Sequence, residues 1–143
     1  MIKAIVNGSA FARLLGAHFH VQEDGSIGAA VMVAQPLEGP PGYAHGGALT
    51  ALLDEAMGAA VWFAGYRVLA VHLRIDFKRP VPVGAEVQVK GQVERREGRK
   101  VFTTGSILLP DGALAVSGSG IFVDAPQVLP ESMPGFSFTP LSE

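Results

Sequence analysis

The fold of this chain is decided by residues 44–64, which read AHGGALTALLDEAMGAAVWFA. Alanine, leucine and methionine dominate residues 48–64 and the run continues to Gly65, so we expect a helix. Apolar residues cover nearly its whole circumference, which is typical of a membrane span or of a helix at the centre of a domain. Two adjacent acids and a length of about 17 residues favour a buried helix that is wrapped by a sheet.

The composition narrows the class of protein. The chain has 143 residues, 48% of them apolar, which is enough for one domain with its own core. A formal net charge of −2 gives no reason to expect nucleic acid as a partner, and the absence of cysteine excludes disulfides and thiolate chemistry. The first residues lack the long apolar core of a signal peptide, so we expect a cytoplasmic protein that does not associate with a membrane.

Strands are predicted on both sides of the central helix. Ser9 caps a short helix that ends at Leu15, and Asp24-Gly25 forms the turn of a hairpin with strands over 17–23 and 27–33. His18 and His20 lie on one face of the first strand, but two histidines alone do not make a metal site and none is expected. Alternating patterns after the helix predict four antiparallel strands over 68–77, 86–95, 99–109 and 113–123.

The C-terminal part of the chain changes character near residue 124. Four prolines among its last twenty residues predict an irregular tail over about 124–143, which packs on the surface through Phe136 and Phe138. The domain therefore spans 1–143, with its core at about 9–123. One apolar helix across the concave face of a curved antiparallel sheet gives an α+β fold.

The motif His45-Gly46-Gly47 opens the central helix. N–H groups in the first turn of a helix have no partner inside the helix and lie at the positive end of its dipole. Glycine allows a ligand to approach this backbone closely. The motif is thus compatible with an oxyanion hole for a carbonyl group, and equally with an ordinary glycine-rich helix entry.

Asp54 lies in the middle of the same helix. A buried carboxylate is costly unless it is paired, and desolvation raises its pKa toward the range of a general base. Spacings of three and four residues place it on one stripe with small or polar neighbours that leave room for a substrate, mainly Gly47, Thr50 and Gly58. The alternative is an acid that the sheet leaves exposed. Glu55 points about 100° away and is interpreted as a structural or exposed acid.

The spacing between these two motifs has a consequence for assembly. Gly46 and Asp54 are eight residues apart, or about 12 Å along a helix axis. Both groups must lie within about 3 Å of the reacting atoms, so one chain cannot supply both to one carbonyl. If both take part, two antiparallel helices related by a two-fold axis bring Asp54 to Gly46 of the partner, which predicts a homodimer.

These motifs give the chain a resemblance to the hotdog-fold thioesterases, within them to the PaaI-like thioesterases of phenylacetic acid pathways. The similarity covers about residues 15–123 and rests on the order of five motifs: His45-Gly46-Gly47, Asp54, LRIDFKRPVPVG at 73–84, EGRK at 97–100 and Asp111-Gly112. It implies a hotdog fold and hydrolysis of acyl-CoA without a metal or redox cofactor. It also implies dimers that often pair into tetramers.

The resemblance assigns roles to individual residues. It implies Asp54 as general base or nucleophile, the Gly46 N–H as the group that polarises the thioester carbonyl, and His45 as a residue that helps to hold the site. Many relatives carry Ser or Thr at the position of Ala70, so here His72 or Thr50 assists the water, or the step is unassisted. Gly47, Thr50, Gly58 and His72 are the expected substrate-binding residues.

Coenzyme A carries phosphates, so a basic rim is expected near the site. Arginine suits phosphate oxygens because it donates two parallel hydrogen bonds. The candidates are Arg79, Arg95, Arg96, Arg99 and Lys100, although charges at a hairpin turn are often only solvated.

The expected function is that of an acyl-CoA thioesterase acting across a dimer interface. Two other classes stay open. A non-catalytic acyl-CoA binding or sensing domain would keep the pocket but would not need Asp54. A hotdog hydratase or dehydratase would need its own histidine and acid in a different setting, and His45 has other neighbours than the usual motifs of those enzymes.

Overall fold

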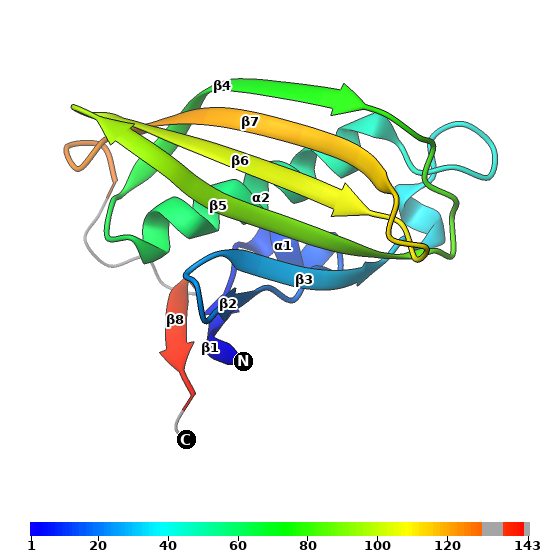
Figure 1. Cartoon of the computed structure of the whole chain (residues 1–143), viewed down its shortest axis with the longest axis horizontal. Coiled ribbons are helices and arrows are strands. Elements are labelled where there is room, and N and C mark those ends of the chain that lie inside the picture. The colour runs from blue at the N-terminus through cyan, green and yellow to red at the C-terminus, as the bar shows by residue number, and fades with distance from the viewer. Residues whose placement is uncertain (130–135, 142–143) are drawn as a thin grey trace.

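The structure, a computed structural model, describes residues 1–129 and 136–141. The described residues form two α-helices, a short 3₁₀ turn at Gln35–Leu37 and one antiparallel sheet of eight strands in the order β4-β7-β6-β5-β3-β2-β1-β8 (Figure 1). The bounds of the helices and strands are β1 Ile2–Asn7, α1 Ala10–Leu14, β2 His20–Gln22, β3 Ile27–Met32, α2 Gly46–Phe63, β4 Val68–Phe77, β5 Glu86–Glu97, β6 Lys100–Leu108, β7 Leu114–Asp124 and β8 Ser137–Pro140.

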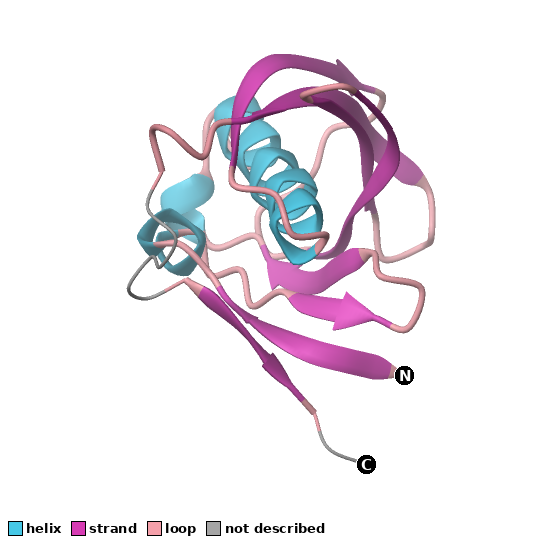
Figure 2. Ribbon diagram, turned by 90° about the vertical axis from the view of Figure 1, so that its left-hand side faces the viewer, coloured by secondary structure: helices cyan, strands magenta, loops and turns pink. Residues whose placement is uncertain are grey.

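The sheet curls around α2, as Figure 2 shows. Eight residues of this helix are buried, and at about 100° per residue they occupy a face about 200° wide, whereas the half-buried Asp54 and Gly58 lie on the opposite face. The central helix and its wrapping sheet confirm the predicted α+β hotdog architecture. The helix begins two residues before the predicted start, because His45 caps it, and it ends at Phe63 before Gly65, which has a φ of 105°.

Three glycines allow the helix to lie close to the sheet. Gly91 of β5, Gly105 of β6 and Gly118 of β7 are register partners in neighbouring strands and form a row across the sheet. A Cβ atom added to Gly91 would lie 2.5 Å from the carbonyl carbon of Ala56 and 2.6 Å from the nitrogen of Met57. At Gly91 the helix backbone occupies the space that a side chain would otherwise fill, and at Gly105 and Gly118 the side chain of Leu53 does so.

The two ends of the chain differ from the prediction. Residues 2–7, for which no element is predicted, form β1, and part of the predicted irregular tail forms β8, which pairs with β1 from Ala4↔Pro140 to Asn7↔Ser137. The sheet thus extends beyond the expected core at 9–123. The prolines predict irregular structure over the whole tail, but Pro140 is the last residue of an edge strand, where a missing N–H is tolerated. Residues 130–135 and 142–143 of that tail lie outside the described residues.

Two further predictions concern the tail and the first strand. Phe138 packs edge-on against Phe63 with ring centroids 5.2 Å apart, which confirms the predicted packing of the tail. The strand predicted over 17–23 is shorter, at His20–Gln22, because the N–H of Ala17 donates to the carbonyl oxygen of Ala12 and closes the end of α1.

Within the described ranges, no helix combines the length and the apolar character that a membrane span requires.

Candidate active site

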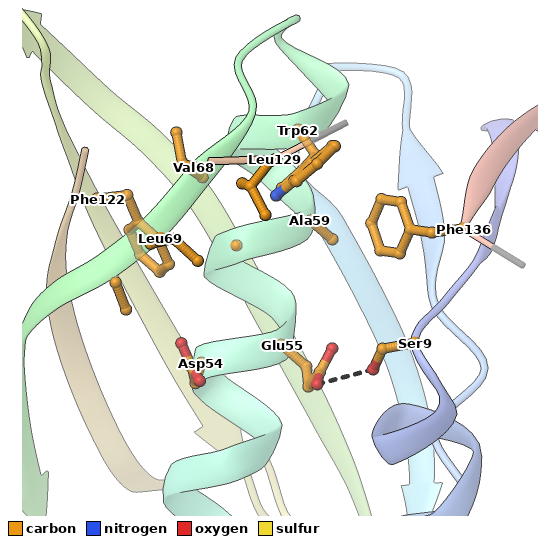
Figure 3. A pocket seen from close by; sticks show the side chains of 12 residues that line it. Ser9, Asp54, Glu55, Ala59, Trp62, Val68, Leu69, Phe122, Leu129 and Phe136 are labelled. Carbon is orange, nitrogen blue, oxygen red and sulfur yellow. Dashed lines mark hydrogen bonds between the residues drawn. The ribbon is translucent and has the colours of Figure 1, made fainter. Parts of the chain in front are cut away.

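A pocket of about 330 Å³ opens along one face of α2 (Figure 3). Residues at helical spacing on α2 form its floor, and segments from both ends of the chain and from two strands form its walls. The floor consists of Asp54, Glu55, Gly58, Ala59 and Trp62, and the walls consist of Ser9, Val68, Leu69, Ala70, Phe122, Leu129 and Phe136.

Asp54 is half-buried in this pocket. Its side chain faces the start of β4 and Phe122 (Figure 3), and Gly58, one helical turn further on, adds no side chain to the space in front of it. Burial raises the pKa of Asp54, and no charge or hydrogen bond of the described residues opposes this effect. A carboxylate of this kind accepts a proton more readily than an exposed aspartate does.

Glu55 also lines the pocket and is half-buried, so of the two predicted alternatives, a structural or an exposed acid, the structural one fits. Its side chain points away from Asp54 toward α1, where the hydroxyl of Ser9 donates a 2.9 Å hydrogen bond to Oε1. Burial and the nearby charge of Asp54 raise the pKa of Glu55, and the hydrogen bond from Ser9 partly opposes them. Ser9 Oγ also accepts the N–H of Ala12 at 3.0 Å and so caps α1.

The sequence shows Ser9 as a helix cap but gives no sign of its second role. Ser9 and Glu55 are 46 residues apart, and no local pattern of residues predicts such a contact. The pocket residues Leu129 and Phe136 are missed for the same reason, since they come from a segment predicted to be irregular.

The start of α2 forms a second, separate feature. His45 Nδ1 accepts the N–H of Gly47 at 2.8 Å, so the neutral imidazole carries its proton on Nε2. The N–H of Gly47 is therefore already engaged. Gly46 occupies the first helical position, where an N–H has no partner inside the helix and lies at the positive end of the dipole.

Gly46 and Asp54 line different pockets of the same chain. The pocket at Gly46 has a volume of about 290 Å³, and the ring of Phe77 and the side chains of Lys78 and Arg79 contribute to its lining. The pocket at Asp54 contains none of these residues. The structure thus agrees with the spacing argument that one chain does not bring the two groups to one point.

The other predicted substrate-binding residues are placed unevenly. Gly58 lines the pocket at Asp54, but Gly47, Thr50 and His72 do not. Ala70, for which no substrate-binding role is predicted, also lines it. His72 is exposed on β4, beyond a bulge between Ala70 and His72. The hydroxyl of Thr50 donates to the carbonyl oxygen of Gly46 at 2.9 Å and is therefore used within the helix.

The predicted basic rim is divided between the two ends of α2. Arg79 lies at the pocket of Gly46, whereas Arg95, Arg96, Arg99 and Lys100 lie at the turn between β5 and β6. The guanidinium of Arg96 stacks over the ring of Tyr66, just beyond the end of α2, and α2 has 18 residues, or a length of about 27 Å. The hairpin residues of one chain are therefore far from its own Gly46.

Several of these basic groups already have partners. Arg95 stacks over Phe102 at 3.8 Å and pairs with Glu97 at 2.8 Å. Arg99 donates to the carbonyl oxygen of Asp124.

No three His, Cys, Asp or Glu side chains group closely enough to bind a metal ion anywhere in 1–129 or 136–141.

Comparison with known proteins gives consistent matches. A sequence model of the thioesterase superfamily matches residues 41–116. The chain is 40% identical over 78 residues to acyl-coenzyme A thioesterase THEM4 of Xenopus laevis, which covers 54% of this chain and 35% of that protein. It is also 40% identical over 87 residues to acyl-coenzyme A thioesterase THEM5 of Mus musculus, and this match covers 59% of this chain and 34% of that protein. The chain spans about a third of the length of these curated relatives.

Solved structures show the same fold. A crystal structure of a thioesterase superfamily protein is 34% identical and has a TM-score of 0.72, covering 75% of this chain and 55% of that chain. A mutant of the phenylacetic acid degradation protein PaaI from Thermus thermophilus is 26% identical with a TM-score of 0.75, covering 82% of this chain and 100% of that chain.

Proposed function

Because this chain belongs to the thioesterase superfamily, we propose that it hydrolyses an acyl-CoA thioester to a free acid and coenzyme A. The observation that carries the proposal is Asp54, a half-buried carboxylate with a raised pKa at a largely apolar pocket. The names of the relatives THEM4 and THEM5, both acyl-coenzyme A thioesterases, support the same substrate class.

In the proposed reaction, Asp54 acts as a general base toward water. It accepts a proton while the water oxygen forms a bond with the thioester carbon, and the Gly46 N–H stabilises the oxyanion. The C–S bond then breaks, and the thiolate of coenzyme A receives the proton from Asp54. Direct attack by Asp54 would instead form a mixed anhydride and release the thiolate, and attack of ¹⁸O-labelled water on the aspartyl carbonyl of that anhydride would place ¹⁸O in the Asp54 carboxylate in a single turnover.

The proposed enzyme is a homodimer in which Asp54 of one subunit acts with Gly46 of the other. The separate pockets of these residues in one chain support this arrangement. So does β4, an edge strand with exposed apolar side chains: Leu69 is 46% exposed, Val71 61% and Phe77 54%. Such an edge is a template for pairing with another chain. The family resemblance adds that two dimers form a tetramer.

Coenzyme A is proposed to lie on the side of Gly46. Arg79 and Lys78 line that pocket and offer positive charge to its phosphates. Arg95 and Arg99 are weaker candidates, because Glu97 and a backbone carbonyl already occupy their guanidinium groups.

The first test is release of free thiol from a panel of aromatic and aliphatic acyl-CoAs. We expect the protein to turn over at least one of them. Shifts of the melting temperature by acyl-CoA without release of thiol would contradict the proposal and favour a binding or sensing domain. Hydration of an enoyl-CoA without release of thiol would favour a hydratase.

Complementation between two inactive variants tests the shared site. Asp54→Asn removes the base. Gly46→Pro removes the N–H and adds a ring whose Cβ would lie 3.4 Å from the ring of Phe77. The backbone accepts the change, because proline is favoured at the first helical position, and His45, with φ −66° and ψ 134°, already has the backbone that precedes proline. Equal amounts of the two chains, unfolded and refolded together, form heterodimers with one intact site. We expect about a quarter of wild-type activity, from random pairing in a two-fold dimer.

Each variant refolded alone is expected to be nearly inactive. A mixture of Asp54→Asn with Asp54→Ala is the matched control and gains no activity, because none of its dimers contains an intact site. If the mixture of Asp54→Asn and Gly46→Pro also gains none while both chains dimerise, the two groups do not act across the interface.

A further inference from the structure

The C-terminal segment builds one wall of the pocket at Asp54. Leu129 and Phe136 both line it, and the rings of Phe136 and Trp62 lie 5.3 Å apart between centroids. Figure 3 shows Phe136 beside Trp62 and Ala59, on the side of α2 away from β4. Leu129 and Phe136 both lie outside residues 41–116, the part of the chain that matches the thioesterase superfamily.

Phe136 is held in place from two directions. The next residues form β8, which pairs with β1 over four positions. Phe136 also packs edge-on against Phe138 at 5.7 Å, and Phe138 packs against Phe63 near the end of α2. A ring that is fixed by both a strand and an aromatic cluster forms a wall of defined position.

The chemistry of the pocket changes along its length. Its acidic and hydroxyl groups, Asp54, Glu55 and Ser9, gather toward one end, and Trp62, Leu129 and Phe136 lie toward the other (Figure 3). Asp54 and Trp62 are eight residues apart, or about 12 Å along the helix. A thioester carbonyl placed at Asp54 therefore directs an apolar acyl group along α2 toward Trp62 and Phe136.

We propose that Phe136 is a specificity-determining residue that limits the length of the acyl group. The inference rests on the proposed function, because it takes this pocket as the acyl site. The acyl group would end against the aromatic ring, and a longer one would need the ring to move out of its contacts with Trp62 and Phe138. A pocket of about 330 Å³ is at the small end of the range for ligand sites.

The test compares kcat/KM for straight-chain acyl-CoAs from butanoyl to palmitoyl in the wild type and in Phe136→Ala. The variant is expected to move the optimum to longer chains and to raise kcat/KM about tenfold or more for the substrates just beyond the wild-type optimum, as expected for one or two methylenes in an apolar pocket. Phe136→Trp is expected to shift the optimum toward shorter chains.

Phe138→Ala is the matched control. It makes the same change in the same aromatic cluster, but Phe138 does not line the pocket. Because Phe138 supports Phe136 but leaves its ring in the pocket, the chain-length profile of Phe138→Ala should shift much less than that of Phe136→Ala. An unchanged profile in Phe136→Ala, or the same shift in Phe138→Ala, would overturn the inference.

A second readout separates this inference from the proposed function. Dissociation constants of the acyl-CoA series are measured by calorimetry in Asp54→Asn, with and without Phe136→Ala. Thiol release by the wild type with unchanged chain-length profiles contradicts only the role of Phe136. If the wild type releases no thiol at all, the proposed function fails, and a shift of binding toward longer chains still supports Phe136 as the wall.

Discussion

Replacement of Asp54 by asparagine is expected to lower kcat for acyl-CoA hydrolysis by about 10²–10⁴-fold, the usual contribution of a positioned general base. Asparagine keeps the size of the side chain and its place in the pocket but cannot accept a proton from water. The base acts in the chemical step, so KM should change much less than kcat. Steady-state kinetics of thiol release measure both quantities.

The pH profile of the wild type gives a second view of the same group. The reaction needs the ionised carboxylate, so kcat/KM should fall as the pH is lowered through the pKa of Asp54. Burial raises that pKa, so the acidic limb should lie above the ordinary aspartate range. Asp54→Asn should lose this limb from its residual activity.

Stability shows whether the loss of activity reflects unfolding. The raised pKa means that the folded state binds the Asp54 proton more tightly than the unfolded state does, so the charged carboxylate destabilises the fold above the folded pKa. Asp54→Asn should therefore melt at a higher temperature than the wild type at neutral pH. The gain should disappear in acid, where Asp54 is protonated in both states. A variant that melts lower at neutral pH contradicts this account.

Glu55→Gln is the matched control for the neighbouring acid. Glu55 lines the same pocket, but its Oε1 accepts the hydroxyl of Ser9 and its side chain points toward α1. We expect less than a tenfold change in kcat, well below the contribution of a positioned base. If instead Glu55→Gln is inactive and Asp54→Asn is not, Glu55 is the base.

Replacement of Gly91 by alanine is expected to destabilise the protein by about 3 kcal/mol or more, at the upper end of the cost of overpacking. The new Cβ would lie 2.5–2.6 Å from backbone atoms of Ala56 and Met57. Neither a rotamer change nor a small shift relieves this contact, because the atoms belong to a helix surrounded by the sheet. The midpoint of chemical denaturation measures the loss, and poor soluble expression would be its extreme form.

Gly28→Ala is the control for this substitution. Gly28 also lies within a strand, and its added Cβ would approach Nε2 of Gln22 at 2.7 Å, but this atom is the far end of a flexible side chain. We expect a change within about 0.5 kcal/mol, because the side chain of Gln22 can move. Equal stability of the Gly91 and Gly28 variants would mean that the helix does not depend on the glycine row.

The central elements could be predicted because their signals are local. A long apolar helix that contains Asp54 identifies itself by composition, and the alternation in residues 86–95 identifies a strand with one exposed face. These two patterns are enough to place the helix against a curved sheet. The distance between Gly46 and Asp54 follows from helix geometry alone, and the structure places them in separate pockets.

Contacts between distant segments could not be predicted. The pairing of β1 with β8 joins residues at least 130 positions apart, and neither short segment has a strong strand pattern of its own. The hydrogen bond from Ser9 to Glu55 likewise depends on where α1 docks. The hydrogen bond from the Thr50 hydroxyl to the carbonyl oxygen of Gly46 is a local contact. It could not be predicted either, because the sequence does not distinguish a threonine that binds substrate from one that bonds to its own helix.

The carboxylate and the wall of its pocket come from different parts of the chain. Asp54 lies on the buried central helix, where most changes disturb the core, whereas Phe136 comes from a short segment at the edge of the sheet, outside residues 41–116. Mutations in that segment can alter the shape of the pocket while they leave the helix and its acid untouched. Natural selection could therefore adjust which molecules fit in small steps, with the reactive machinery inherited unchanged.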